Sequence, residues 1–164
     1  MTNEAQVQPA RRIDHLVLPT GSLAVARERL GLLGFTVAPE AIHPFGTGNA
    51  CVYLRDGTYL EPLAVVEREV CEAEARRGNV FVARDAAYRF RRGAEGFSAL
   101  GMGSPDAQAD HRFFTGAGIS AGDLLSFSRQ FVSPDGQSET ASFLLAFAAD
   151  LRAPDAFFFT CQRA

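Results

Sequence analysis

Two stretches of the chain repeat the same order of elements at the same spacing. An apolar strand that contains His15 is followed by a helix pattern that ends at Gly34, 19 residues later. A second strand, which contains Ala99, is followed by a helix pattern that ends at Gly118, again 19 residues later. Glycine is typical of the position after a helix, because the backbone there often adopts a positive φ. The spacing therefore predicts a duplicated strand–helix unit.

Each predicted helix is followed by signals for three further strands. These strands are expected at 35–38, 50–55 and 58–65 in the first half, and at 125–132, 140–149 and 156–162 in the second. Helices expected at 66–77 and 80–92 connect the halves, and Pro134, Asp135 and Gly136 are expected to form a turn. The prediction is an α+β chain: a disordered tail at 1–10, then one domain made of module one (11–65), a helical connector (66–93) and module two (94–164).

Composition excludes several classes of function. The chain has 164 residues, a formal net charge of −3 and no basic block, which argues against a nucleic-acid partner. No apolar run approaches the roughly 20 residues of a membrane span. The three cysteines are scattered without metal-type spacing, as expected in a reducing cytoplasm. All 16 basic residues are arginine, which excludes Schiff-base chemistry on a lysine.

A hairpin in the first half places a carboxylate within an apolar strand. Asp56 and Gly57 form a strong two-residue turn signal between the strands. Side chains alternate along the returning strand, so Tyr59 and Glu61 share one face. A buried carboxylate is unfavourable without a partner. Glu61 is therefore expected at an edge, in an ion pair with an arginine such as Arg55 or Arg12, or in a cavity that has a function.

The segment before this hairpin is polar and rich in glycine. It reads His43-Pro-Phe-Gly-Thr47-Gly-Asn49. Such a loop lets the backbone approach a ligand closely. His43, Thr47 and Asn49 either order the loop through local hydrogen bonds or supply polar groups at the mouth of a cleft. The residues alone leave both interpretations open.

Several motifs together resemble the glyoxalase-like branch of the vicinal oxygen chelate superfamily, which also includes bleomycin resistance proteins and dioxygenases. They are IDHLVL, LGF, HPFGTGN, DGTYLEPLAV and FFFTCQ, which together span about residues 11–162. The resemblance implies two βαβββ modules whose curled mixed sheets enclose a cleft. In this superfamily the cleft often holds a divalent metal.

The resemblance also implies where ligands lie, on the first and fourth strands of each module. In module one these positions match His15 and Glu61, a pair that suits Zn, Ni, Fe or Mn. In module two they match Ala99 and Thr160, neither of which is a strong ligand, so the metal site is expected to be incomplete. The expected ligand-binding residues are His15, His43, Thr47, Asn49, Tyr59, Phe158, Thr160 and Gln162, with Glu61 as the catalytic residue.

Two classes of function remain open from the sequence. One is a small-molecule binding protein without chemistry. The other is an enzyme: a metal-dependent lyase or isomerase of the glyoxalase type that acts on a carbonyl substrate, or a ring-cleavage dioxygenase that recruits His43 or His111. The expected partner is a small molecule, not nucleic acid or a membrane. A homodimer is expected because an exposed sheet edge needs cover.

Overall fold

The structure is a computed structural model that describes residues 10–132 and 137–163. The first module contains β1 (Ile13–Pro19), α1 (Leu23–Leu32), β2 (Ala41–Ile42), β3 (Thr47–Asn49), β4 (Val52–Tyr53) and β5 (Tyr59–Val65). The connector contains α2 (Arg68–Arg76) and α3 (Val80–Arg92). The second module contains β6 (Ala99–Gly103), α4 (Ala107–Gly116), β7 (Leu125–Val132), β8 (Ser138–Ala149) and β9 (Phe157–Arg163). The predicted turn at 134–136 and nearly all of the predicted tail lie outside the described residues.

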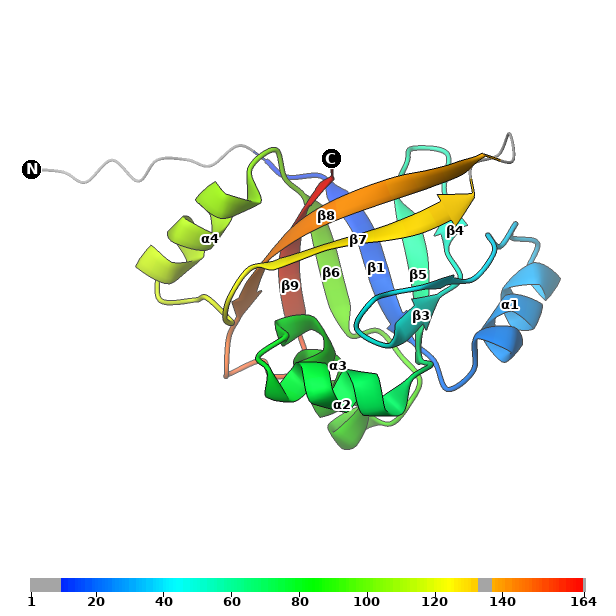
Figure 1. The fold of residues 1–164 in the computed structure, drawn as a ribbon, viewed down its shortest axis with the longest axis horizontal. Helices are drawn as coiled ribbons and strands as arrows, with labels where there is room; N and C mark the ends of the chain where they lie inside the picture. The colour runs from blue at the N-terminus through cyan, green and yellow to red at the C-terminus, as the bar shows by residue number, and fades with distance from the viewer. Residues whose placement is uncertain (1–9, 133–136, 164) are drawn as a thin grey trace, which may run out of the picture.

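The strands form one mixed sheet in which the two modules repeat the same strand order. The order is β2-β3-β5-β1-β6-β9-β8-β7, with β4 also pairing with β5. The first strand of each module pairs in parallel with the last, β1 with β5 and β6 with β9. The modules join through the antiparallel pair β1–β6 at the centre of the sheet (Figure 1). The predicted pair of βαβββ modules is therefore confirmed.

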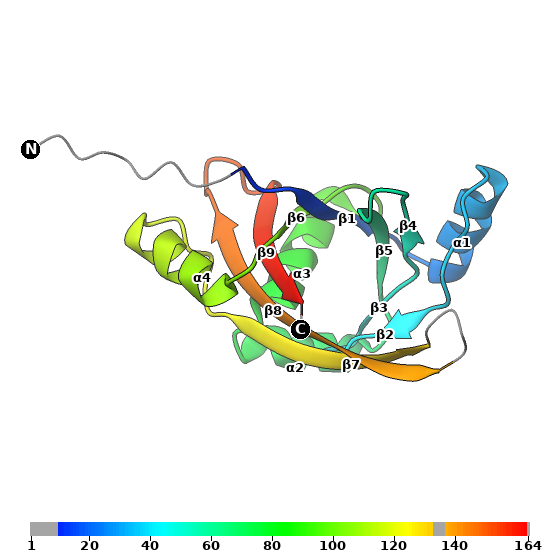
Figure 2. The same ribbon diagram turned by 90° about the horizontal axis from the view of Figure 1, so that it is seen from above.

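The sheet curls until its two ends meet. Figure 2 shows the strands arranged as a nearly closed ring, and the end strands β2 and β7 contact each other. The helices α2 and α3 lie across one end of this ring (Figure 1). The concave face of the sheet is therefore the inside of a short barrel that α3 closes at one end. No helix in the described part of the chain is long and apolar enough to cross a membrane.

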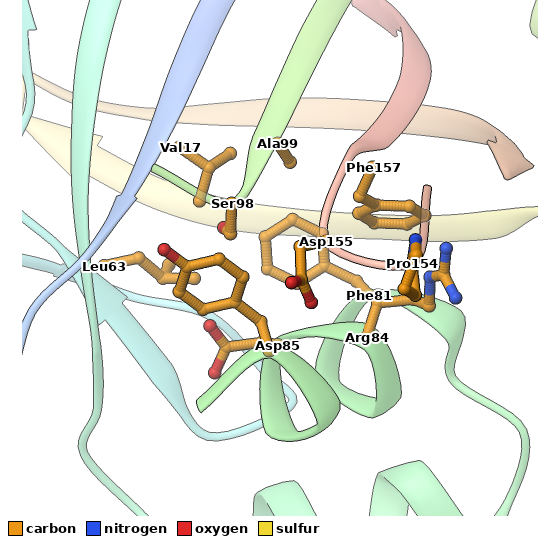
Figure 3. A pocket seen from close by; sticks show the side chains of 11 residues that line it. Val17, Leu63, Phe81, Arg84, Asp85, Ser98, Ala99, Pro154, Asp155 and Phe157 are labelled. Atoms are coloured by element: carbon orange, nitrogen blue, oxygen red, sulfur yellow. The ribbon is translucent and has the colours of Figure 1, made fainter. Parts of the chain in front are cut away.

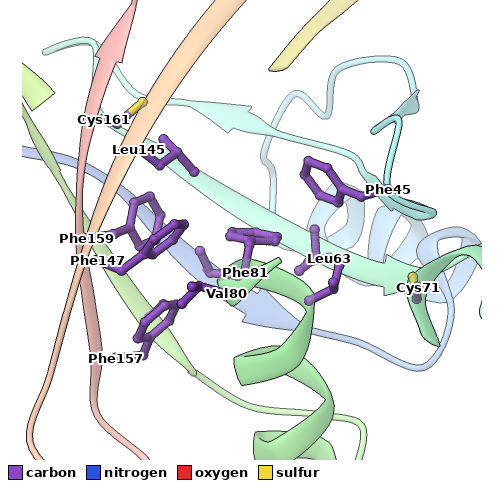
Figure 4. Close-up of a cluster of buried hydrophobic side chains, with 13 residues drawn as sticks. Phe45, Leu63, Cys71, Val80, Phe81, Leu145, Phe147, Phe157, Phe159 and Cys161 are labelled. Carbon is purple, nitrogen blue, oxygen red and sulfur yellow. The ribbon is translucent and has the colours of Figure 1, made fainter. Parts of the chain in front are cut away.

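The core lies between α3 and the concave face. Phe81 projects from α3 toward Phe147 and Phe159, which have no exposed surface (Figure 4). Burying a phenylalanine side chain contributes about 1.5–3 kcal/mol. Strand β9 supplies two of the buried rings, because its alternate residues Phe157 and Phe159 both point inward.

A buried ion pair attaches α3 to the ends of the central strands. Asp85 lies on the side of α3 that faces Leu63 (Figure 3). Arg89 Nε donates to Asp85 Oδ2 at 2.7 Å, and its terminal nitrogens donate to the carbonyl oxygens of Thr20 at 3.0 Å and Leu63 at 2.8 Å. Burial raises the pKa of Asp85, and the hydrogen bond from Arg89 opposes that rise. One guanidinium therefore satisfies carbonyl groups at the ends of both β1 and β5.

The helix ends follow the sequence signals, whereas one predicted strand is absent. The side chain of Ser22 accepts a hydrogen bond from the third residue of α1, and φ is 91° at Gly34 and 69° at Gly118. The segment 35–38 is not a strand: its one ladder-like bond runs from the Ala38 nitrogen to the Cys51 oxygen, at 2.8 Å. Pro39 follows and has no N–H to extend the pairing. The second strand forms later, as β2.

Candidate functional site

Residues of β5 and β6, the two strands that pair with β1, hold His15 on the concave face. Its ring stacks on Tyr59 of β5, with ring centroids 4.5 Å apart and planes 14° apart. On β6 the ring rests against Gly101, where an added Cβ would lie 2.7 Å from His15 Cε1. The imidazole therefore occupies the space that any side chain at position 101 would need. Only glycine permits this close approach between ring and backbone.

An irregularity in β1 supplies the partner of His15. The pairing of β1 with β6 shifts register between Ile13 and His15, as at a β-bulge. Bulges redirect side chains and are common beside active sites. Asp14, the residue in between, lies with its Oδ1 2.6 Å from His15 Nδ1, although neighbouring strand residues normally face opposite ways. The bulge thus converts two adjacent residues into a carboxylate–imidazole pair.

The electrostatics of this pair fix the tautomer of His15. Partial burial raises the pKa of Asp14, but hydrogen bonds from His15 and Arg163 outweigh it, so that this pKa is lowered. Arg163 Nη2 donates to Asp14 Oδ1 at 2.6 Å. An ionised carboxylate only accepts hydrogen bonds, so His15 Nδ1 carries the hydrogen. The other ring nitrogen, Nε2, faces Glu61 with 3.5 Å between Nε2 and Oε2.

Glu61 lies at the centre of the site with 4% of its surface exposed. Its Oε1 accepts a hydrogen bond of 2.7 Å from the side-chain amide of Asn49. His15 Nε2 lies on its other oxygen, and His43 Nε2 is 3.8 Å from Oε1. No arginine of the described chain pairs with Glu61, so the ion pair considered from the sequence does not form there. Of the three predicted environments, the cavity is the one observed.

His43 is a neutral imidazole beside this carboxylate. Burial lowers its pKa to about 4, and the nearby charge of Glu61 opposes that fall only in part. Its Nδ1 lies 2.9 Å from Thr47 Oγ1, and its Nε2 lies 3.3 Å from Asn49 Nδ2. Since the amide nitrogen of Asn49 can only donate, Nε2 accepts and Nδ1 donates. The glycine-rich segment thus orders its own polar side chains and also brings them to Glu61.

A small cavity and a large groove meet at this cluster. The cavity has a volume of about 20 Å³ and is lined by His15, His43, Tyr59 and Glu61, with aromatic side chains closing it. That volume admits one water molecule or a group of similar size. The groove has a volume of about 900 Å³ and runs between the segment 38–41 and the β7–β8 hairpin. Three residues line both spaces: Asn49, Arg129 and Phe143.

The donor atoms in the cavity test whether it fits the divalent metal that the superfamily resemblance implies. The amide of Asn49 lies between Glu61 and His43, so these groups share a neutral donor. Module two contributes the ring of Phe159 to the cavity wall. Among residues 10–132 and 137–163, no three His, Cys, Asp or Glu side chains are grouped to hold a metal ion. The described side chains therefore do not fit a metal ion held by the protein alone.

Four of the predicted ligand-binding residues do not line the cavity. Thr47 bonds His43 without reaching the cavity itself, and the other three lie on the face of β9 that α4 covers. Thr160 and Gln162 alternate with the inward residues Phe159 and Cys161. Gln162 Oε1 accepts a hydrogen bond from the first residue of α4, and Phe158 is 40% exposed. The structure therefore does not bring Phe158, Thr160 or Gln162 to Glu61.

The match of Thr160 with Glu61 is wrong by one residue. His15 pairs with Tyr59, two residues before Glu61, whereas Ala99 pairs with Phe157. The residue equivalent to Glu61 is then Phe159, which faces His15 with ring centroids 5.2 Å apart. Cys161, two residues after Phe159, also points inward and lines the cavity.

Sequence reasoning missed three charged residues of the site: Asp14, Arg129 and Arg163, the last of which bonds Asp14. Regular alternation along a strand places Asp14 on the face opposite His15, and the bulge reverses this. Arg129 lies on β7, more than 60 residues from the other polar groups, and no local motif marks it. The curl of the sheet alone brings it to the cavity.

Paired βαβββ modules curled around a cavity with histidines and a carboxylate define a protein of the vicinal oxygen chelate superfamily. The family model described as a glyoxalase-like domain matches residues 13–164, and the chain belongs to that family. No curated protein matches the sequence.

Solved structures share the fold at low sequence identity. A hypothetical protein from Bacillus halodurans has a TM-score of 0.61 at 15% identity, with 94% of this chain and 96% of that chain covered. A hypothetical protein from Staphylococcus aureus has a TM-score of 0.66 at 15% identity, covering 93% and 59% of the two chains. A variant of Streptomyces coelicolor methylmalonyl-CoA epimerase, in complex with 2-nitronate-propionyl-CoA, has a TM-score of 0.58 at 17% identity, covering 92% and 96%. These likenesses establish the fold alone.

Proposed function

We propose that this chain is an enzyme that moves a proton on a small carbonyl compound, with Glu61 as the group that takes and returns the proton. The observation that carries the proposal is the buried Glu61 carboxylate, surrounded by two imidazoles and an amide in a cavity that shares Asn49 with an open groove. Burying so many polar groups without a function is unfavourable. Clusters of this kind are typical of active sites.

The proposed step moves a proton between the substrate and the Glu61 carboxylate and needs no other reactant. Glu61 accepts the proton of a C–H bond next to a carbonyl group, and the electron pair of that bond moves toward the carbonyl oxygen as an enolate forms. Delivery of a proton to the opposite face of the same carbon epimerises the substrate, return to the original face regenerates it, and return to a neighbouring atom isomerises it. The amide of Asn49 holds Oε1 of Glu61, so the other oxygen is oriented for the transfer.

The surroundings support a proton transfer of this kind. His15 Nε2 faces the second oxygen of Glu61, and the hydrogen bond between Asp14 and Nδ1 fixes that orientation. The cavity of about 20 Å³ admits a methyl- or carbonyl-sized group and excludes bulk water. Methylmalonyl-CoA epimerase, solved with methylmalonyl-CoA, shows that the shared fold accommodates an acyl substrate in that protein.

A binding protein without chemistry is the second candidate. The observation in its favour is the wall contributed by module two, where Phe159 occupies the position equivalent to Glu61. An apolar groove of about 900 Å³ with a few polar groups is the usual form of a small-molecule site. The metal-dependent alternatives, a glyoxalase-type lyase or isomerase and a ring-cleavage dioxygenase, need an ion that substrate or water helps to hold, with His15 and Glu61 as protein ligands.

Deuterium incorporation separates these functions even when the product of the reaction has not been identified. The protein is incubated in D₂O with a panel of acyl thioesters and 2-oxo acids, and exchange at the carbon next to the carbonyl is followed by NMR. Glu61→Gln keeps the shape of the side chain and removes the base, so exchange should fall by about 10²–10⁴-fold. Glu69→Gln, the same change at an exposed position on α2, is the matched control and should retain full exchange.

The same assay is run with a chelator and with added Zn, Ni, Fe or Mn. Exchange that survives the chelator and is lost in Glu61→Gln supports the proposal. Exchange that appears only with an added metal favours the metal-dependent lyase or isomerase. No exchange with any member of the panel, together with a small ligand retained by both variants, favours the binding protein.

A further inference from the structure

Arg129 stands at the boundary between the cavity and the groove. It belongs to β7, which passes beside β2 where the curled sheet closes (Figure 2). Its side chain lines both spaces, and its guanidinium carbon lies 5.8 Å from the centre of the Phe143 ring. A ligand that extends from the groove toward Glu61 has to pass this guanidinium.

The charge of Arg129 is not matched within the described part of the chain. No carboxylate of residues 10–132 and 137–163 lies within ion-pair distance of it. Its Nε is buried and lacks a hydrogen-bond partner there, while the guanidinium bonds the neutral hydroxyl of Tyr53, which leaves its charge unmatched. A buried donor without a partner costs about 1–3 kcal/mol, and more when it is charged. Such an arrangement is favourable only if something else in the functioning protein supplies the acceptor.

The other charges of the groove are already balanced or hydrated. Arg163 pairs with Asp14 at 2.6 Å, and Glu40 lies 4.0 Å from Arg27. Glu139 lines the groove but is exposed to solvent. The groove therefore has one positive charge to offer. That charge matches a monoanion, because a dianion such as phosphate needs more than one cation or several added donors.

We propose that the substrate of the site is a carboxylate-bearing molecule whose carboxylate binds Arg129 in the groove. The planar guanidinium forms paired hydrogen bonds with a carboxylate, and the ring of Phe143 packs against the adjoining carbon chain. The reactive end then points past Asn49 toward Glu61. This inference rests on the proposed proton-transfer function for the role of that reactive end, but the anion site itself does not depend on it.

The test compares two ligands of the same chain length, one with a charged carboxylate and one with a neutral amide. Binding of hexanoate and of its neutral analogue hexanamide is measured by ligand-observed NMR. The wild-type protein should bind hexanoate at least roughly tenfold more tightly, as expected for a hydrogen-bonded charge pair. Arg129→Gln should abolish the preference, and Arg129→Lys should keep part of it. Arg152→Gln, at a side chain that is 91% exposed, is the matched control and should keep all of it.

Equal binding of hexanoate and hexanamide by the wild-type protein, or an unchanged preference in Arg129→Gln, would overturn the inference. Tighter binding of inorganic phosphate than of acetate would also overturn it, since a dianion would then be the preferred ligand. Thermal unfolding of each variant shows that it is folded. If Arg129→Gln does not fold, the comparison of Arg129→Lys with wild type decides.

The deuterium assay separates this inference from the proposed function. With a 2-oxo carboxylate and its amide as substrates, Arg129→Gln should raise the concentration of the carboxylate needed for half-maximal exchange by about tenfold and leave the value for the amide unchanged. Exchange that depends on Glu61 but shows no preference for the carboxylate overturns the anion site alone. Preferential binding of the carboxylate without exchange supports the anion site and contradicts the enzyme.

Discussion

Replacing Gly101 by alanine tests whether the His15 ring lies against the backbone of β6. The new Cβ would lie 2.7 Å from Cε1, 2.9 Å from Nδ1 and 3.1 Å from Nε2 of His15. Heavy atoms do not approach this closely, so the ring must move, and the stacking on Tyr59 and the bond to Asp14 hold it where it is. Overpacking of a fixed site costs about 1–3 kcal/mol.

A second effect acts in the opposite direction. Gly101 does not have a positive φ, so alanine is compatible with its backbone and lowers the entropy of the unfolded chain. That gain is about 0.4–1 kcal/mol. The expected net loss in the free energy of unfolding is therefore about 0–2.6 kcal/mol. Gly103→Ala is the control, since its Cβ would meet the flexible side chain of Arg12 at 3.4 Å, and it should leave stability unchanged or slightly higher.

Urea unfolding of a double-mutant cycle makes the reasoning refutable. In a His15→Ala background the ring is absent, so Gly101→Ala should no longer destabilise the protein. A coupling free energy of about 1–3 kcal/mol between the two positions is expected, as for residues in direct contact. If Gly101→Ala is equally destabilising with and without the imidazole, the clash with His15 is not the cause. If it is stabilising in the wild-type background, the ring does not occupy this space.

Two further predictions concern buried charge. Burial lowers the pKa of His43 from 6.5 to about 4. Between these two pH values His43 is protonated in the unfolded chain and neutral in the folded chain. Stability should fall by about 3 kcal/mol as the pH drops through this window, and His43→Gln should lose that part of the pH dependence in urea unfolding at pH 7 and pH 4. Arg89→Met leaves Asp85 buried without its partner and should destabilise the protein by about 3–5 kcal/mol. Arg77→Met, at a 74% exposed side chain, should change stability by less than about 0.5 kcal/mol in the same thermal or urea assay, and equal effects of the two changes would contradict the reasoning.

The fold was predictable wherever local chemistry determines the backbone. Glycines with positive φ end α1 and α4, and Asp56 with Gly57 turns the chain between β4 and β5. Prediction failed where pairing with a distant strand decides the outcome. The segment 35–38 has the residues of a strand, but its neighbour in the sheet is reached only after Pro39.

The face of β9 shows a different limit of the sequence. Alternation identifies which residues share a face, but it does not say which face is inside. The match to the superfamily's ligand positions placed Thr160 inward, whereas the pairing of β6 with β9 places Phe159 there. The register of a strand pair is a tertiary property, and an error of one residue reverses every side chain.

Within the site, the residues closest in sequence were the easiest to find. His15 and Glu61 stood out because the resemblance assigns both positions, and the glycine-rich segment pointed to His43 and Asn49. Asp14 was hidden by a bulge, which depends on how β1 pairs with β6. Arg129 was hidden by the closure of the sheet.

The two duplicated modules contribute different parts of the candidate site. Among residues 10–132 and 137–163, the nitrogen groups that contact the Glu61 carboxylate all come from module one. The strands β7 and β8 of module two supply one wall of the groove. Substitutions in β7 and β8 can therefore change the size and charge of the accepted molecule while the carboxylate and its imidazoles stay in place. Variation in the substrate range of such a protein is expected to concentrate in one hairpin, and a library confined to residues 129–130 and 138–143 samples it directly.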